Sequence, residues 1–229
     1  MQSGPELIVM LTKNDQTVPH AAELFSALRH TRANYFGFKD KPLSPAEMRR
    51  LTAEIHAAGK TAVFEVVEYD EPACLAGARA AAACGSDILM GTRFFDSVND
   101  LCRASGMRYL PFVGAVSERP SVLEGTAEEM IREADACLAK GVAGFDLLGY
   151  RHTGDAVRLI REFVRAVPAT VCVAGSVNSF ARLDELKEIS PWAFTIGSAF
   201  FDGRFHGTIA EQIDAVCGYM HDETTVLSR

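Results

Sequence analysis

Eight short apolar runs, each followed by a longer amphipathic stretch, organise this sequence. Several runs are apolar throughout, which is typical of parallel strands covered on both faces. Eight alternating strand and helix units predict a closed (β/α)8 TIM barrel, whereas a doubly wound open sheet would use fewer strands and longer connections. The expected strands are Glu6–Lys13, Asn34–Asp40, Thr61–Glu68, Asp87–Thr92, Arg108–Val113, Gly144–Gly149, Thr170–Gly175 and Ala193–Gly197.

The amphipathic stretches carry the start and stop signals of helices. Ser44 and Glu47 are spaced as a capping box, with Pro45 at the first helical position. Thr126 and Glu129 repeat this spacing before a second apolar helix face. Glycine is expected to end several helices just before the next strand, as in the left-handed C-terminal caps of many helices. These glycines are Gly59, Gly85, Gly106 and Gly141.

Length and charge restrict the class of protein. The 229 residues favour one domain spanning 1–229. The formal net charge of −7 argues against nucleic acid as a partner, because proteins that bind polyanions carry an excess of Lys and Arg. The apolar runs are too short for a membrane span or a signal peptide, so we expect a cytoplasmic protein with no membrane partner. The six cysteines are scattered singly, which predicts reduced thiols and neither a zinc site nor a disulfide framework.

The most specific chemical signal lies at the ends of the last two expected strands. Gly175 and Ser176 follow the seventh strand, and Gly197 and Ser198 follow the eighth. Small residues at a strand end let backbone N–H groups approach a ligand, and barrels often bind phosphate at this pair of loops. These four residues are therefore predicted to bind phosphate. The alternative is that each glycine only permits a tight turn.

The segments Ala174–Ser179 and Thr195–Phe200 resemble the ends of ribulose-phosphate-binding-type barrels. That group includes phosphoribosylanthranilate isomerase, the histidine-pathway phosphoribosyl isomerase and N-acetylmannosamine-6-phosphate 2-epimerase. The resemblance covers the last third of the chain. It implies a phosphorylated sugar-like ligand that contacts Gly175, Ser176 and the equivalent pair after the eighth strand, and it does not select a reaction.

The chain also departs from several members of that group. The phosphoribosyl isomerases carry a Cys or Asp at the end of strand one, where this chain has Thr12–Asp15 and Asp15 is expected in the loop. The Asp-x-Lys-x-x-Asp pattern of the orotidine-phosphate decarboxylases is missing from Glu65–Asp70. Lys39 occupies a position where a metal-dependent epimerase would need a ligand. We therefore expect neither a metal nor another cofactor.

Three ionisable residues are predicted to point into the barrel. Side chains alternate faces along a strand, so placing the neighbouring bulky residues under the helices turns Lys39, Glu65 and Asp146 inward. A buried charge without a partner costs several kcal/mol or more, which favours a functional acid/base set. The alternative is a structural ion pair between Lys39 and Glu65, with Asp146 solvated.

Other candidates lie where strands and loops meet. Lys13 at the end of strand one, and Arg151 and His152 at the end of strand six, are predicted to bind substrate, with Arg151 suited to a carboxylate or second anion. The insert Ser117–Gly125 is expected either to cover the site as a lid or to be a surface loop. Three phenylalanines are expected to be exposed, at a site rim or in a homo-oligomer contact. They are Phe200, Phe201 and Phe205.

These residues suggest an isomerase or epimerase acting on a phosphorylated sugar or sugar acid. Glu65 or Asp146 would remove a proton next to a carbonyl group, and Lys39 would stabilise the enolate. One alternative is a class I aldolase with Lys39 as the Schiff-base nucleophile, its pKa lowered by burial. Another is a regulator that binds a phosphorylated metabolite without turnover, as in the similar antiterminator barrels that bind RNA.

Overall fold

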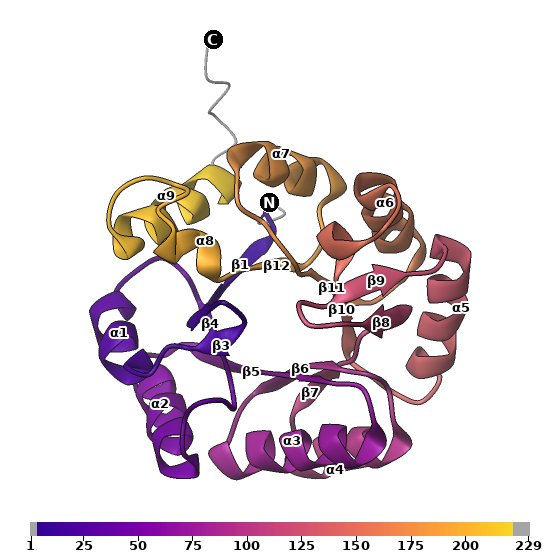
Figure 1. The fold of residues 1–229 in the computed structure, drawn as a ribbon, viewed down its shortest axis with the longest axis horizontal. Helices are drawn as coiled ribbons and strands as arrows, with labels where there is room; N and C mark the ends of the chain where they lie inside the picture. The colour runs from indigo at the N-terminus through magenta and orange to yellow at the C-terminus, as the bar shows by residue number, and fades with distance from the viewer. Residues whose placement is uncertain (1–3, 222–229) are drawn as a thin grey trace.

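Eight parallel strands surround the centre of the computed structural model, which describes residues 4–221 (Figure 1). Their order in the sheet is β10-β11-β12-β1-β4-β5-β6-β7. The two edges meet through a bridge between Phe112 and Asp146, so the sheet is a nearly closed barrel. The predicted (β/α)8 architecture is confirmed. The strands are β1 (Glu6–Met10), β4 (Tyr35–Lys39), β5 (Thr61–Glu68), β6 (Ile88–Thr92), β7 (Arg108–Leu110), β10 (Gly144–Leu147), β11 (Thr170–Val173) and β12 (Ala193–Ile196).

Helices form a ring around the barrel (Figure 1). The capping boxes predicted at Ser44 and Thr126 are present, each with its side chain accepting from the backbone N–H of the glutamate three residues later. All four predicted helix-ending glycines have positive φ, between 70° and 86°. The helices are α1 (Ala21–Leu28), α2 (Pro45–Ala57), α3 (Glu71–Cys84), α4 (Asp96–Ser105), α5 (Ala127–Leu138), α6 (Ala156–Ala166), α7 (Phe180–Ile189), α8 (Ser198–Phe201) and α9 (Ile209–His221). A 3-10 turn, Gly149–Arg151, follows β10.

Alternation along the strands separates two apolar layers. Phe36, Phe38 and Phe64 lie between strands and helices, and the rings of Phe38 and Phe64 are 5.1 Å apart. A smaller cluster of mostly aliphatic side chains fills the barrel interior. This division matches the predicted alternation and places Lys39, Glu65 and Asp146 on the inner face. The interior cluster is Ile8, Met10, Val63, Ile88, Met90, Leu110, Cys172 and Ala193.

The first expected strand, Glu6–Lys13, is shorter in the structure. The strand β1 ends at Met10, and the chain then forms a small antiparallel hairpin of β2 (Thr12–Lys13) and β3 (Gln16–Thr17). The hairpin turns at Asn14 and Asp15, whose φ angles of 50° and 68° lie in the left-handed region that Asn and Asp tolerate. This turn brings Asp15 back over the end of β4.

The insert Ser117–Gly125 belongs to a second hairpin, formed by β8 (Ala115–Ser117) and β9 (Val122–Glu124). The Tyr69 hydroxyl lies 2.9 Å from both the Glu118 carbonyl oxygen and the Ser121 hydroxyl. Arg119 donates to the Val67 carbonyl and to the Glu68 carboxylate, each at 2.7 Å. The insert is therefore fastened to the end of β5 and does not extend freely into solvent.

The expected exposure of three phenylalanines is wrong. Phe200 and Phe205 are buried, and Phe201 is partly buried against the main core. The rings of Phe200 and Phe205 lie 5.8 Å apart, and Phe205 also contacts Phe180 at 5.4 Å. Burial under α9 and α7 explains these aromatic residues, so they do not indicate a subunit contact. Within residues 4–221, no helix has the length and apolar character needed to cross a membrane.

Candidate functional site

An ion cluster lies at the carboxyl ends of β4 and β5. Lys39 ends β4 and lies opposite Glu65 of β5 in the sheet register. Its Nζ atom is 2.5 Å from Oδ1 of Asp15 and 3.4 Å from Oε2 of Glu65. The Thr17 hydroxyl donates to the Lys39 carbonyl at 2.8 Å and accepts the Lys39 N–H at 2.7 Å, which fastens the β2–β3 hairpin to β4. These bonds hold Asp15 against the Lys39 ammonium.

The charges in this cluster stabilise one another. Burial alone would lower the pKa of Lys39, but the carboxylates of Glu65 and Asp15 hold that pKa above its usual value. For Asp15, burial raises the pKa and the Lys39 ammonium lowers it, and the net pKa lies below its usual value. Lys39 and Asp15 therefore both remain charged across neutral pH.

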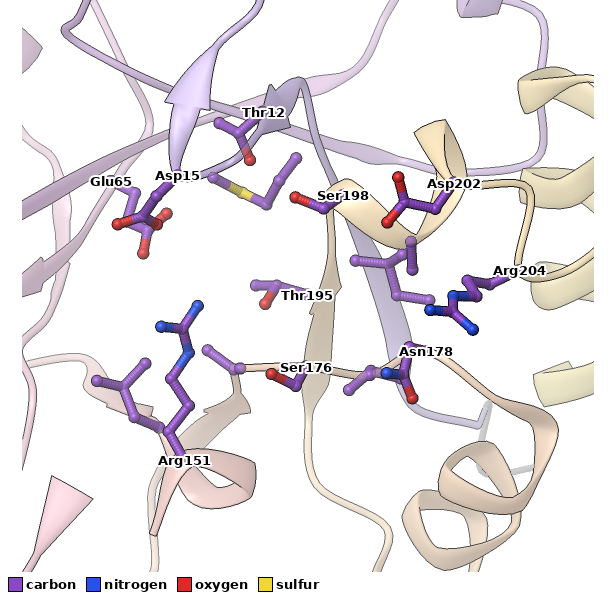
Figure 2. Close-up of a pocket in the computed structure, with 18 of the residues that line it drawn as sticks. Thr12, Asp15, Glu65, Arg151, Ser176, Asn178, Thr195, Ser198, Asp202 and Arg204 are labelled. Carbon is purple, nitrogen blue, oxygen red and sulfur yellow. The ribbon is translucent and has the colours of Figure 1, made fainter. Parts of the chain in front are cut away.

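A cavity of about 250 Å³ adjoins the cluster. Asp15, Lys39 and Glu65 line one side of it, and the segments that follow β11 and β12 line the other. Figure 2 shows Arg151 reaching into this cavity towards Asp15 and Glu65, with Arg204 on the opposite side. Cations thus lie at both ends of a cavity that also holds three carboxylates, those of Asp15, Glu65 and Asp202.

Asp146 is buried in the barrel interior and does not line this cavity. Neither of its carboxyl oxygens has a hydrogen-bond partner among the described residues. Burial and the negative charge of Glu65 raise the pKa of Asp146 well above its usual value, and the positive charges of Lys39 and Arg151 offset only part of this rise. The Asp146 carboxyl therefore keeps its proton to a higher pH than an exposed aspartate does.

The four residues predicted to face a phosphate line the same cavity as the ion cluster. A Cβ atom on Gly197 would lie 2.8 Å from Oγ1 of Thr12, so glycine is required where the hairpin approaches the end of β12. The Ser198 hydroxyl accepts the Asn14 N–H at 3.1 Å, which leaves the hydroxyl proton available to a ligand. The four residues are Gly175, Ser176, Gly197 and Ser198.

Two of the three residues predicted to bind substrate do not line the cavity. Lys13 is half-exposed on the β2–β3 hairpin, with its Nζ atom 4.0 Å from Oδ1 of Asp202. His152 places Nε2 2.9 Å from the Gly125 carbonyl oxygen, and its Nδ1 accepts the Gly154 N–H at 3.1 Å. Both ring nitrogens of His152 are therefore occupied by backbone groups at the base of the β8–β9 hairpin. The third residue, Arg151, lines the cavity.

Sequence patterns missed several cavity residues. Asp15 was expected only as a loop residue, because no periodicity indicates that the chain turns back after β1. Thr195 lies two residues before Gly197 on β12, so the alternation that identified Lys39 would have placed it inward. Arg204 follows the short helix α8, where no local pattern indicates its direction. The cavity residues that were not singled out include Thr12, Asn178, Thr195, Asp202 and Arg204.

Asp15 and Lys39 also line a second cavity, of about 290 Å³, beside the first. Arg119 and Pro120 of the β8–β9 hairpin line this second space, together with Glu68. The ion cluster therefore lies between two cavities. In residues 4–221, no three or more His, Cys, Asp or Glu side chains are arranged to hold a metal ion.

No model of a protein family matches the chain, and no curated protein matches its sequence. Solved structures do share its fold. A 4-hydroxy-2-oxoglutarate/2-dehydro-3-deoxyphosphogluconate aldolase has 17% identity over 93% of this chain and 94% of its own, with a TM-score of 0.66. Phosphoribosylanthranilate isomerase from Thermotoga maritima has 18% identity over 94% and 98%, with a TM-score of 0.60. N-acetylmannosamine-6-phosphate 2-epimerase from Clostridium perfringens has 14% identity over 91% and 90%, with a TM-score of 0.62.

The chain has the fold of these barrels. In sequence the resemblance covered only the last third of the chain, whereas in structure it covers more than nine-tenths. The resemblance to phosphoribosylanthranilate isomerase and to the epimerase is thereby confirmed as a similarity of fold. The matched structures include an aldolase, an isomerase and an epimerase, so the fold does not select among these reactions.

Proposed function

We propose that the protein is an isomerase or epimerase that removes a proton next to a carbonyl group of a phosphorylated sugar or sugar acid. One observation carries the proposal: the Asp15–Lys39–Glu65 cluster and the Gly-Ser ends of β11 and β12 line one cavity. Two solved structures with this fold, phosphoribosylanthranilate isomerase and N-acetylmannosamine-6-phosphate 2-epimerase, are named for phosphorylated sugar-like molecules and support the same class.

Glu65 is the best-placed base. It lines the cavity, and its carboxylate lies 3.4 Å from Lys39, whereas Asp15 is held at 2.5 Å and has a lowered pKa. In the proposed step, a proton moves from the substrate carbon to Glu65, and the C–H electron pair forms an enolate. Delivering a proton to the opposite face of the same carbon gives the epimer. Delivering the proton to the adjacent carbon, while the hydroxyl proton of the enediol moves to the other oxygen, gives the isomer.

Lys39 would stabilise the enolate oxygen as a fixed positive charge. Its raised pKa keeps it protonated, and its position between two carboxylates holds the ammonium at the edge of the cavity. Asp146 does not suit the role of base for which the sequence made it a candidate. Its raised pKa disfavours the ionised form that a base needs, and it lies outside the cavity lining.

The phosphate would bind at the opposite side of the cavity. The backbone after β11 and β12 turns at Ser176, with φ 55°, and at Gly197, and the Ser198 hydroxyl and the Arg204 guanidinium add donors. Backbone N–H groups together with one guanidinium suit the three oxygens of a phosphate monoester. Fixing the phosphate there would position the carbonyl end of a short sugar near Lys39.

The charge on Lys39 argues against the aldolase alternative. A Schiff-base lysine attacks as the neutral amine, and a raised pKa makes that form scarce. We therefore expect borohydride, added with a reactive carbonyl ligand, to leave Lys39 unmodified. Covalent trapping at Lys39 would instead support the aldolase.

A thermal-shift screen of phosphorylated ketoses, aldoses and sugar acids tests the proposal first. A ligand at about one hundred times its Kd adds about 2.7 kcal/mol to the free energy of unfolding. Phosphorylated compounds should raise the Tm of the wild type and leave that of Gly197→Asp unchanged, because the new side chain would meet Thr12. Unphosphorylated sugars, phosphate and sulfate are the controls.

Compounds that raise the Tm are then incubated with the protein in D2O and followed by proton NMR. Loss of the signal of the hydrogen next to the carbonyl, without fragmentation, supports the isomerase or epimerase. Cleavage into two products would indicate an aldolase, and binding without exchange would indicate a non-catalytic regulator. If no phosphorylated compound raises the Tm, the phosphate site is wrong.

A further inference from the structure

The Arg151 side chain reaches the cavity by passing the end of a neighbouring strand. Arg151 ends the 3-10 turn after β10, and its side chain passes across Gly175 at the end of β11. A Cβ atom on Gly175 would lie 2.8 Å from Cγ and 3.3 Å from Nε of Arg151, and Gly175 has a φ of +88°. Glycine at this position therefore makes room for the arginine as well as shaping the strand end.

The guanidinium of Arg151 is incompletely paired. One terminal nitrogen donates to the Ser121 carbonyl at 3.3 Å, while the buried Nε has no hydrogen-bond partner among residues 4–221. Arg151 forms no ion pair with a carboxylate in the described part of the chain. Lys39, in contrast, is paired with both Asp15 and Glu65.

A guanidinium that lies inside a cavity and has no carboxylate partner is suited to a ligand with a planar anionic group. The guanidinium presents parallel N–H donors that match the two oxygens of a carboxylate. Figure 2 shows Arg151 and Arg204 on opposite sides of the cavity. Two separated cations can bind two separated anionic groups of one ligand, and a phosphate at the Arg204 side would occupy only one of them.

We infer that Arg151 binds a carboxylate group of the substrate, so that the substrate is a phosphorylated sugar acid. The inference rests on the proposed phosphate site and narrows the proposed substrate class. Of the three cations that line the cavity, only Lys39 forms an ion pair with a carboxylate among the described residues, so the guanidinium of Arg151 is left for a ligand.

Two stable compounds of similar size test this inference. D-3-Phosphoglycerate and D-glycerol 3-phosphate (sn-glycerol 1-phosphate) share the configuration of the central carbon and differ in that one carries a carboxylate where the other carries a hydroxymethyl group, and neither has the ketone or aldehyde needed for turnover. Calorimetric titration should show that the wild type binds phosphoglycerate about tenfold or more tightly than glycerol 3-phosphate, as expected for a charge-assisted pair.

Variants of Arg151 and Gly175 locate the source of that preference. Arg151→Met should abolish the preference and leave the affinity for glycerol 3-phosphate within about threefold of wild type. Gly175→Ala should weaken the preference by displacing the arginine, and Arg151→Lys should retain part of it, because the charge remains without the planar fork. Arg158→Met is the matched control, since Arg158 is exposed on α6 and paired with Glu162.

The outcomes separate this inference from the proposed function. Equal affinities for the two compounds in the wild type, or a preference that persists in Arg151→Met, would overturn the carboxylate site while leaving the phosphate site intact. If neither compound binds the wild type, both the phosphate site and the carboxylate site are wrong. Thermal melts of every variant establish that each is folded before titration.

Discussion

At the scale of single residues, Asp146 has the strongest consequence for stability. The unfolded chain releases its proton near pH 3.9, while the folded protein, with the raised pKa, keeps it to higher pH. A group whose pKa is raised in the folded state adds to the free energy of unfolding at pH values below its unfolded-state pKa. That contribution is lost as the pH rises towards its folded-state pKa. The contribution of Asp146 to the free energy of unfolding is therefore smaller at neutral pH than in mild acid.

Asp146→Asn removes this titration while keeping the shape of the side chain. Relative to wild type, the free energy of unfolding of Asp146→Asn should rise with pH, by about 1.4 kcal/mol for each pH unit between the two pKa values. Urea unfolding at about pH 4.5 and about pH 7.5 measures the difference. A difference that stays constant between these pH values would contradict the assignment of a retained proton.

Lys39 has the opposite dependence on pH. Without it, the partly buried carboxylates of Asp15 and Glu65 would lose the cation that pairs with both, and the cost of about 3–5 kcal/mol for breaking a buried pair is an upper bound for these side chains. The pKa of Asp15 is lowered in the folded state. The pairing with Lys39 therefore adds to the free energy of unfolding above the unfolded-state pKa of about 3.9, and this contribution is lost as the pH falls through the folded-state pKa.

Lys39→Met should therefore lower the free energy of unfolding by a few kcal/mol at about pH 8, and by less at about pH 4. Chemical denaturation at both pH values checks this. Lys140→Met, which breaks an exposed pair with Asp96, should cost under about 1 kcal/mol at either pH. A loss from Lys39→Met as small as that of the control would show that the buried cluster contributes no more than a surface pair.

The direction of a site side chain could be predicted from the sequence where the residue lies on a strand with regular alternation. Lys39, Glu65 and Asp146 lie on strands, and the period of two along a strand indicates which face each occupies. Arg151 was predicted as a substrate-binding residue and lines the cavity, whereas Asp15 could be expected only in a loop, because it lies in a turn whose direction depends on distant contacts. Asp15 is positioned by the Thr17 bonds to β4, and Arg151 by the space that Gly175 leaves.

At the scale of elements, the β8–β9 hairpin is the segment most directly coupled to the site. It carries Ser121, whose carbonyl accepts from Arg151, and it is fastened to the end of β5 by Tyr69 and Arg119. Residues that line the cavities and residues that hold the hairpin are therefore in contact. Loosening the hairpin should alter the position of Arg151.

Tyr69→Phe tests that coupling by removing the hydrogen bonds to Glu118 and Ser121. Amide hydrogen exchange in the hairpin should become faster, while the Tm changes little, because a partly exposed hydrogen bond contributes about 1 kcal/mol. Tyr219→Phe, whose hydroxyl bonds Asp184 away from the hairpin, should leave hairpin exchange unchanged. Unchanged exchange in Tyr69→Phe would show that other contacts hold the hairpin.

Helix starts are the elements that the sequence predicted best, since a capping box is a local pattern. At α5, the Thr126 hydroxyl accepts the Glu129 N–H, and the Glu129 carboxylate accepts the Thr126 N–H at 2.8 Å. Thr126→Ala should lower the free energy of unfolding by about 1 kcal/mol, measured by urea denaturation. Ala127→Ser, one position inside the helix, provides a comparison that keeps the cap and should cost less.

At the scale of the whole molecule, the barrel collects residues that are distant in sequence. Asp15, Lys39 and Glu65 come from the first third of the chain, and the proposed phosphate-binding loops come from the last quarter. The order of eight parallel strands brings β12 beside β1, which joins the two groups at one end of the barrel. Repeated strand and helix patterns were sufficient to predict this arrangement, whereas the exact strand ends depended on hairpins and turns without a regular period.

The central claim is that Glu65 removes a proton from a phosphorylated substrate bound in this cavity. Proton NMR in D2O, with a compound that raises the Tm of the wild type, measures that step directly. We expect exchange of the hydrogen next to the carbonyl by the wild type and by the control Glu54→Gln, whose side chain is partly exposed on α2 and paired with Arg50. Exchange by Glu65→Gln should be at least about a hundredfold slower. Exchange by Glu65→Gln at the wild-type rate would contradict the assignment of Glu65 as the base.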